Sequence, residues 1–479
     1  MRLPSRLWAA AAAGLTAGAA ARAGPNLSYE DPAWRRLADE IAVGRAAEQT
    51  GGVGWVSEDS PPGFWLTPLD RITLRAQLVD EHDRPYSLPA RPRQIAGGIA
   101  LACEYQEGRP CGDGAGGALE LEGAAGWGNM FTADLRLRGS AGTANFASEV
   151  AVDRAYLKFE AGPFALQAGR DVLAVGPSVR AGLMVSRNAA PQDGFRAQLR
   201  PVALPLVPAT KISFFYFLDR LRDPQRFEGT IADLARAQLD FGDRVQLGGS
   251  RMLEMGGHGA PDYGGITGFI KEHFGRGGSG VEENNRLSFD VAVRLPELRG
   301  ARVYYEIAFE DTRKKFFFNS LQYDADHLLG IEVRDLRLGA LRRVFLELEH
   351  TGWVSQEHGT FTSGMTNDGR TFGSALGPDG ASLWLKADLQ LGPALFSPWA
   401  EWLRFVSDSY DTDEEHGVFV TRSGQLEHRQ RIGADVQMPI AGFVLFSAGA
   451  FGERIGNADL VTGQTRYGGG LRAALTFSQ

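Results

Sequence analysis

Cysteine is almost absent from this chain. Its 479 residues contain two cysteines, Cys103 and Cys111, which bracket a short loop. In an exported protein such a pair predicts one disulfide bond, and the alternative is two incidental thiols. Two cysteines are too few for a structural zinc site, which takes four ligands. We therefore expect no metal bound by these cysteines, and no cofactor.

Long apolar runs are also missing. Beyond residue 23 no segment offers the roughly 18 uninterrupted apolar residues that a membrane-spanning helix needs. Residues 1–23 are typical of a signal peptide, with Arg2 and Arg6 as its basic start, an apolar stretch over 7–20, and Ala21-Arg22-Ala23 as the cleavage site. The sequence therefore predicts an exported chain without a transmembrane helix.

Positive charge and enzyme motifs are scarce as well. The 50 basic residues are outnumbered by 58 acidic ones, giving a formal net charge of −8, which disfavours nucleic acid as a partner. The chain has no G-x-S-x-G and no H-E-x-x-H motif, and its eight histidines are scattered. We expect a protein that is not an enzyme.

The most regular pattern lies in residues 286–310. Apolar and polar residues alternate along RLSFDVAVRL, and after the turn PELRG the alternation resumes in ARVYYEIAFE. Period-two alternation predicts two strands of a hairpin, each with one apolar and one polar face. A soluble sandwich would share this pattern. Strands of about 10 residues with a wholly apolar outer face, repeated many times, indicate instead a transmembrane β-barrel.

Short turns and long connections alternate through the rest of the chain and predict 18 antiparallel strands. They are expected near 94–103, 117–126, 130–138, 145–160, 164–171, 194–200, 209–219, 232–241, 245–253, 286–295, 301–311, 328–337, 343–353, 381–391, 395–407, 427–438, 443–453 and 465–477. Outer-membrane barrels place short turns in the periplasm and long loops outside the cell. An even strand number then puts both termini in the periplasm of a Gram-negative cell.

Residues 24–93 have a different pattern and are expected to form a short periplasmic segment in front of a barrel that spans 94–479. Asp31-Pro32 is a helix start, and apolar residues at helical spacing predict a helix over about 31–49. The remainder is broken by prolines and contains one possible strand at 72–79. The expected fold class is thus all-β, with a short helical N-terminal segment.

The polar faces of the predicted strands carry both charge signs. Arg154, Lys158 and Glu160 face the lumen in one strand, and Trp384 with Lys386 in another. A barrel of 18 strands is wide enough to hold water or a polymer unless loops fill it. Mixed signs favour a crowded lumen whose charges pair with one another, and the alternative is a continuous open pore.

The segment 155–199 carries a characteristic set of positions, namely Gly169-Arg170, Gly176-Pro177, Gly182-Leu183, Ser186, Asn188-Ala189 and Pro191. In these positions it resembles the Wzi family of capsule assembly outer-membrane proteins. Val175 replaces an aromatic residue of the family pattern, and Ala190 stands where an arginine is usual. The similarity extends over about 150–395 and is poor at the N-terminus.

This resemblance implies an 18-stranded barrel that binds and positions capsular polysaccharide or exopolysaccharide at the cell surface. The implied partners are that polymer and outer-membrane lipid, with polysaccharide export machinery as a further candidate. A channel is the alternative function, either a diffusion porin or a conduit for polymer export. A porin needs an open lumen, whereas a surface lectin tolerates a plugged one.

The loop at 172–193 is the best candidate for contact with such a polymer. Arg170, Arg180, Arg187 and Asn188 lie in or beside it. Arginine suits carboxylates through paired donors, and asparagine both donates to and accepts from hydroxyl groups. In the alternative interpretation, the Gly-Pro turn folds this loop back into the barrel and the arginines pair with carboxylates of the wall.

An acidic cluster at 408–416 is a second candidate site. Asp411, Asp413 and Glu415 would supply the oxygen ligands that Ca²⁺ prefers. The alternative is a solvated acidic loop, since no turn glycine stands at the spacing of an EF-hand.

Overall fold

The computed structural model describes most of the chain after residue 62. The described residues are 63–80, 84–85, 98–99, 105–106, 109, 113–128, 130–143, 146–222, 224–261, 265, 267–268, 283–310, 321–413, 417–422 and 424–478. The predicted signal peptide at 1–23, the predicted helix at 31–49, and both cysteines, Cys103 and Cys111, lie outside these residues. Within them, no helix has the length and hydrophobicity needed to cross a membrane.

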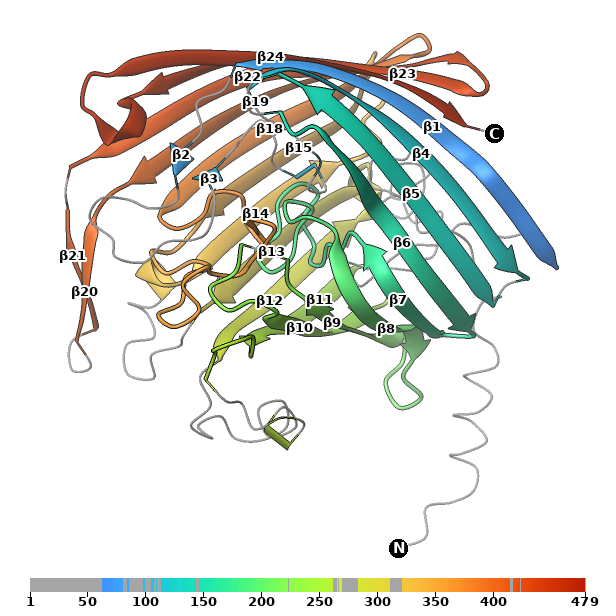
Figure 1. The fold of residues 1–479 in the computed structure, drawn as a ribbon, viewed down its shortest axis with the longest axis horizontal. Coiled ribbons are helices and arrows are strands. Elements are labelled where there is room, and N and C mark those ends of the chain that lie inside the picture. Colours follow the sequence, from blue (N-terminus) through green and yellow to red (C-terminus); the bar gives the residue numbers. More distant parts are fainter. Residues whose placement is uncertain are drawn as a thin grey trace, which may run out of the picture.

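Eighteen strands form one closed antiparallel barrel (Figure 1). In chain order they are β1 (Phe64–Asp80), β4 (Gly114–Trp127), β5 (Phe131–Gly142), β6 (Glu149–Ala161), β7 (Phe164–Asp171), β8 (Gln192–Ala203), β9 (Thr210–Arg220), β10 (Ile231–Phe241), β11 (Val245–Met255), β12 (Asn284–Leu295), β13 (Ala301–Phe309), β14 (Asp326–Val333), β15 (Leu341–His350), β18 (Gly380–Leu391), β19 (Ala394–Val406), β22 (Leu426–Ala441), β23 (Val444–Gly456) and β24 (Thr465–Ser478). Each strand pairs with the next, and β1 closes the ring by pairing with both β4 and β24. The predicted all-β antiparallel barrel and its strand number are confirmed.

Three further strand pairs lie in the connections. They are β2 (Arg84–Pro85) with β3 (Gly98–Ile99), β16 (Thr366–Asn367) with β17 (Arg370–Thr371), and β20 (Ser409–Asp413) with β21 (Gly417–Thr421). The β20–β21 hairpin extends away from the barrel wall (Figure 1).

The two ends of the barrel differ in their connections. Tight turns such as 242–244 and 296–300 join strands at one end, which we call the short-turn end. Long connections such as 172–191 and 351–379 join them at the other, the long-loop end. The alternation of short and long connections expected from the sequence is therefore present.

The wall reverses the usual pattern of burial. In β12, Arg286 is 1 % exposed and faces the lumen, whereas Phe289 is 57 % exposed on the outer face. A water-soluble protein normally buries its apolar side chains and exposes the charged ones. Alternation along each strand thus gives an apolar outer surface and a polar lumen, as predicted.

The barrel starts earlier than the sequence predicted. Strand β1 lies in the wall, and the expected first strand at 94–103 does not; the described part of that stretch, Gly98–Ile99, pairs instead with β2. The predicted boundary at residue 94 is therefore wrong. Pro68 and a register shift between Thr67 and Arg71 interrupt the alternation of β1, which hid the first half of this strand.

Candidate functional site

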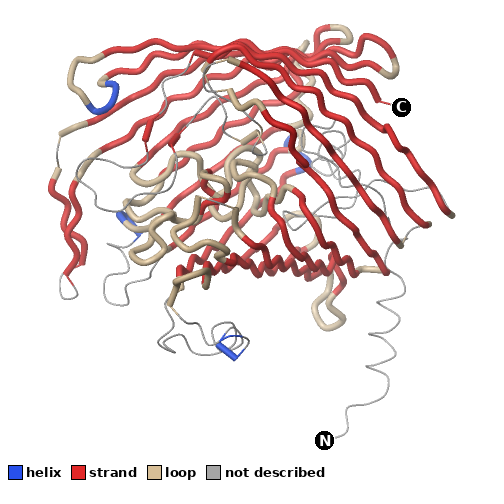
Figure 2. Tube along the Cα trace, viewed as in Figure 1, coloured by secondary structure: helices blue, strands red, loops and turns tan. Residues whose placement is uncertain are grey.

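Two long connections fold back into the lumen, where Figure 2 shows the loops gathered inside the ring of strands. We call residues 172–191 the first inner loop and residues 351–379 the second inner loop. Ser178 Oγ of the first inner loop donates a 2.7 Å hydrogen bond to Glu347 Oε1 of β15. At Gly176 φ is +105°, and a Cβ there would approach a wall carboxylate to 3.1 Å, so this turn requires glycine. The Gly-Pro turn therefore directs the loop inward.

The two inner loops are bound to each other by side-chain hydrogen bonds. Ser186 Oγ donates to the Gly373 carbonyl oxygen over 2.6 Å. Asn188 Nδ2 donates to the carbonyl oxygen and to Oγ1 of Thr371, over 3.1 and 2.9 Å. Both donor residues are buried. These contacts join two segments that are far apart in sequence into one unit inside the barrel.

This unit packs on apolar side chains that point inward from one side of the wall. Phe217 of β9 stacks on Phe372 of the second inner loop, with ring centroids 6.5 Å apart. The buried apolar wall residues of this side are Phe215, Phe217, Ala232, Leu234, Met252, Ala292, Tyr304, Ala308 and Leu328. This part of the lumen is therefore filled like the core of a soluble protein. The lumen is crowded there, as predicted, but by apolar contacts and not by the paired charges that the sequence indicated.

The other part of the lumen contains a cavity of about 810 Å³. Its walls come from β1, β4, β5, β18, β19 and β22 to β24, and the first inner loop closes one side. Lining residues run from Pro393 and Gly442 at the short-turn end to Phe146 near the long-loop end. The cavity thus follows the barrel axis for most of the strand length.

Basic side chains dominate the lining of this cavity. Ten basic and four acidic side chains of the described residues line it, although the whole chain has a net charge of −8. The basic residues are Arg71, Arg75, Arg109, Arg136, Arg138, Arg180, Arg187, Lys386, Arg431 and Arg472, and the acidic ones are Glu120, Glu122, Glu401 and Asp435. Such an excess makes the cavity attractive to anions.

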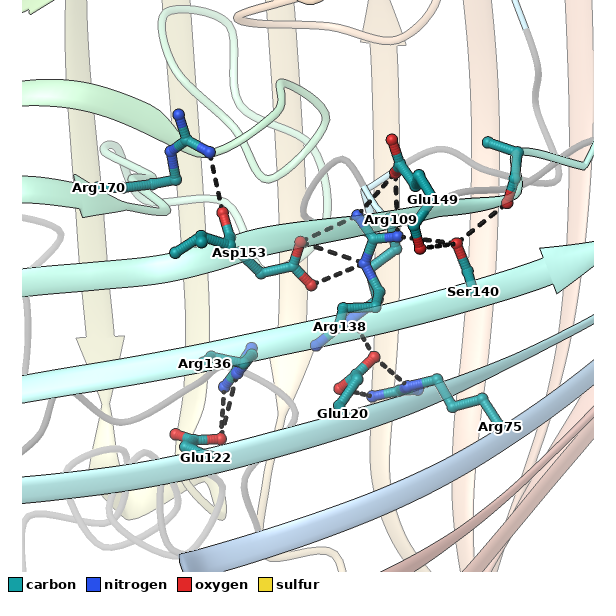
Figure 3. Close-up of polar contacts among 12 residues, drawn as sticks. Arg75, Arg109, Glu120, Glu122, Arg136, Arg138, Ser140, Glu149, Asp153 and Arg170 are labelled. Atoms are coloured by element: carbon teal, nitrogen blue, oxygen red, sulfur yellow. Dashed lines mark hydrogen bonds and ion pairs between the residues drawn. The ribbon is translucent and has the colours of Figure 1, made fainter. Parts of the chain in front are cut away.

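Three carboxylates of the lining, Glu120, Glu122 and Glu401, are each shared among two or more guanidinium groups. Figure 3 shows this arrangement, in which Glu120 of β4 pairs with Arg75 of β1 over 2.7 Å and with Arg109, which precedes β4, over 3.1 Å. Glu122 is likewise shared by Arg136 of β5 and an arginine of β6, over 3.0 and 3.1 Å. One carboxylate cannot neutralise two guanidinium groups, so positive potential remains in the cavity.

Arg180 of the first inner loop connects the basic lining with aromatic rings. Its guanidinium lies 5.1 Å from the ring centroid of Tyr105 and 5.4 Å from that of Trp384, within the range of cation–π attraction. It also donates a 2.6 Å hydrogen bond to Glu401, which accepts a second bond from Arg431 over 2.9 Å. The group combines fixed cationic donors, an acceptor and flat apolar rings, which suits an acidic ligand rich in hydroxyl groups.

The structure places the four residues that were predicted to bind polymer in different environments. Arg180 and Arg187 line the cavity. Arg170 instead pairs with Asp193 through two 2.5 Å hydrogen bonds at the start of β8. Asn188 is buried in the contact between the inner loops. The alternative interpretation from the sequence, in which the loop folds inward and its arginines meet wall carboxylates, describes the observed positions of Arg170 and Arg180.

The predicted calcium ligands are described only in part. Asp411 and Asp413 lie in β20, but their side chains and all of Glu415 fall outside the described residues. The described part of the chain contains no group of three or more His, Cys, Asp or Glu side chains placed to hold a metal ion.

Several lining residues were not assigned a role from the sequence. Alternation correctly placed Trp384 on the inner face, but nothing in the sequence showed that the first inner loop brings Arg180 between Trp384 and Tyr105. Arg75 was missed because its strand, β1, was not counted in the barrel. Counting β1 from the alternation at 72–79 would have found it.

Comparison with known proteins identifies the family. The model of the family described as capsule assembly protein Wzi matches residues 98–467. The chain belongs to this family. A search of curated protein sequences found no match.

A solved structure agrees with the fold of this Wzi-family chain. The chain is similar to Wzi of Escherichia coli, an outer-membrane protein involved in group 1 capsule assembly and described as a carbohydrate-binding β-barrel. That similarity has a TM-score of 0.62 at 16 % identity and covers 86 % of this chain and 85 % of the E. coli chain. OccD3 (OpdP) of Pseudomonas aeruginosa matches with a TM-score of 0.45 at 11 % identity over 96 % of this chain and 99 % of that one, which is too distant to carry an argument.

Proposed function

We propose that this Wzi-family barrel binds and positions capsular polysaccharide or exopolysaccharide at the surface of a Gram-negative cell. Family membership and the similarity to a carbohydrate-binding barrel of E. coli support this function. The long-loop end faces outward and both termini are periplasmic, following the usual orientation of outer-membrane barrels. The polymer is held without chemical change, and polysaccharide export machinery is a candidate partner.

The observation that carries the proposal is the lining of the cavity. Guanidinium groups outnumber carboxylates there, and Arg180 is held between two aromatic rings. Bacterial surface polymers often carry uronic acids or similar acidic groups among many hydroxyls. Arginine pairs with the acidic groups through two donors, and the ring of Trp384, which lines the cavity, offers flat apolar contact to sugar rings.

The filled part of the lumen argues against the alternative of a wide diffusion porin. Water and small solutes cross such a porin through a continuous open lumen, and here an apolar core joins the inner loops to the wall. A polymer conduit is distinguished from a binding protein by its conductance.

The test is retention of the producer's own purified polysaccharide by the detergent-solubilised full-length protein. The variant Arg180→Gln with Arg187→Gln should weaken retention about tenfold or more, because each lost charge-assisted hydrogen bond is worth one to several kcal/mol. Arg244→Gln is the matched control, since Arg244 lies on an exposed turn at the short-turn end and pairs with Glu297. It should retain polymer like the wild type.

Three outcomes would contradict the proposal. In the first, the double variant retains polymer as well as the control does. In the second, the wild type shows a steady large conductance in planar bilayers that the polymer blocks, which would make the barrel a channel. A shortened polymer after incubation, measured by size-exclusion chromatography, would argue against a purely binding role.

A further inference from the structure

A second recess lies on the outer face of the wall at the long-loop end. It has a volume of about 280 Å³ and is formed by the ends of β15, β18 and β19 together with residues of the neighbouring connections. Its lining includes His350, Arg404, Arg422, Asp379, Asp408 and Tyr410. None of these residues lines the luminal cavity, so the two sites are separate.

The position of His350 shows that the recess faces away from the lumen. Glu347 and Glu349 of the same strand are buried, and Glu347 contacts the first inner loop inside the barrel. Because side chains alternate along a strand, Leu348 and His350 point to the outer face. Both are exposed. Arg404 of β19 is exposed in the same way, between two buried residues.

Basic and imidazole side chains form a row across this part of the outer face. The cross-strand register aligns His327 with His350, His350 with Ala381, Ala381 with Arg404, and Arg404 with His428. The rings of His327 and His350 are stacked, with centroids 6.2 Å apart. Within the described part of the chain, Arg404 has no hydrogen bond or ion pair, so its guanidinium is available to a ligand.

The row marks the edge of the apolar outer surface on the long-loop side. Two residues further along each strand toward the short-turn end, about 7 Å from the row, the outward side chains are apolar. They include the exposed residues Leu329, Leu348 and Trp402. Still closer to the short-turn end lie further exposed apolar residues such as Ile331 and Leu385. A barrel meets the hydrocarbon of the membrane with such a band. The row and the recess therefore lie at the level of the lipid headgroups on the long-loop side.

The walls of the recess combine aromatic rings with carboxylates. Trp353 stacks on Tyr410 with centroids 5.0 Å apart, and Tyr410 donates a 2.7 Å hydrogen bond from its hydroxyl to Asp379. Asp408 lies 3.7 Å from a guanidinium nitrogen of Arg422. The two carboxylates would repel a bare phosphate ion but accept hydrogen bonds from sugar hydroxyls. Together with the basic row, they indicate a ligand that carries both a phosphate and sugar hydroxyl groups.

We propose that this recess binds the phosphorylated sugar headgroup of a glycolipid in the outer leaflet of the membrane. Arg404 and His350 bind a phosphate, and Asp379 and Asp408 accept hydrogen bonds from hydroxyl groups of the sugar. The acyl chains of the glycolipid extend from there along the apolar band that begins at Leu348. This lipid site lies on the outer side of the wall and does not depend on the polysaccharide site in the lumen.

The experiment titrates the detergent-solubilised full-length protein with lipid A, a phosphorylated diglucosamine glycolipid, and follows binding by native mass spectrometry. Arg404→Gln combined with His350→Gln should weaken binding on the order of tenfold, because charge-assisted bonds to a phosphate are lost. Arg404→Lys keeps the charge and should keep most of the affinity. Arg454→Gln is the control, because Arg454 is an exposed arginine of β23 that does not line the recess.

The expected result is a loss of lipid A binding confined to the recess double variant, together with weak binding of dephosphorylated lipid A to the wild type. Equal weakening by Arg454→Gln would overturn the proposal, because binding would then reflect general attraction to a basic outer surface. The proposal also fails if dephosphorylated lipid A binds as tightly as the phosphorylated form. Displacement of lipid A by an equal concentration of inorganic phosphate would contradict the role assigned to the sugar.

Discussion

Single carboxylates determine how much positive charge the luminal cavity presents. Glu401 is nearly fully buried and accepts hydrogen bonds from both Arg180 and Arg431. It orients the two guanidinium groups, but it also opposes an anionic ligand placed beside them. Its removal therefore has two effects of opposite sign, one on ligand binding and one on stability.

Glu401→Gln should tighten the binding of an acidic polymer about fivefold, because a repulsion of about 1 kcal/mol between charges near 4 Å in water is removed. Binding of a neutral polymer such as dextran should not change. At the same time the barrel should unfold at lower urea concentration, since two buried guanidinium groups lose their shared partner. Polymer retention and urea unfolding followed by tryptophan fluorescence measure the two effects separately.

Glu332→Gln is the matched control for this prediction. Glu332 is also buried and shared by two arginines, Arg302 over 3.0 Å and Arg334 over 2.7 Å, but it does not line the cavity. The control should lose stability and leave polymer retention unchanged. If Glu332→Gln tightens retention as much as Glu401→Gln does, the effect does not arise in the cavity.

At the scale of single elements, the inner loops decide whether the lumen is open. Their conformation was left open by the sequence, because a loop with Gly-Pro and several arginines is compatible with both an external and an internal position. The outcome depends on contacts between residues far apart in sequence, such as Ser186 with Gly373 and Asn188 with Thr371. No periodic pattern records such contacts. Asn188 was consequently expected to contact polymer, although it joins the two loops.

Replacing Ser186 and Asn188 by alanine removes three side-chain hydrogen bonds between the inner loops. Together they stabilise the packed position of the loops by about 3 kcal/mol. Their loss should raise the population of displaced loops about a hundredfold. The expected readouts are frequent channel openings in planar bilayers and entry of a large antibiotic such as vancomycin into cells that produce the variant.

Arg222→Gln is the control for the loop variant. Arg222 forms a 3.4 Å ion pair with Asp368 of the second inner loop, but both side chains are more than one-third exposed to solvent. Exposed pairs contribute at most about 1 kcal/mol, so the control should stay closed. Wild-type conductance in the Ser186 and Asn188 variant would show that the apolar core alone holds the loops in place.

At the scale of the whole molecule, the sequence predicts most strands of the barrel wall, but not the strand that closes the ring. Seventeen of the expected strands coincide with strands of the ring, because alternation is a local property that membrane and lumen impose on every strand. The missing strand is β1, whose alternation breaks at Pro68. Strand β1 nevertheless closes the ring, because it pairs with β4 from Phe64 to Val79 and with β24 from Arg71 to Asp80.

A truncation series tests whether β1 belongs to the folding unit. A chain that begins at Gly63 directly after the signal peptide should insert into the outer membrane and migrate as a folded, heat-modifiable band. A chain that begins at Gln94 lacks β1 and should be degraded, because β4 and β24 would each expose a row of unpaired backbone groups in lipid, at a cost of several kcal/mol per group. A stable, heat-modifiable barrel from the shorter chain would mean that β4 and β24 can pair directly and that β1 is an addition to a ring of seventeen strands. Failure of both chains, with folding of the full-length protein, would place an essential folding element before Gly63.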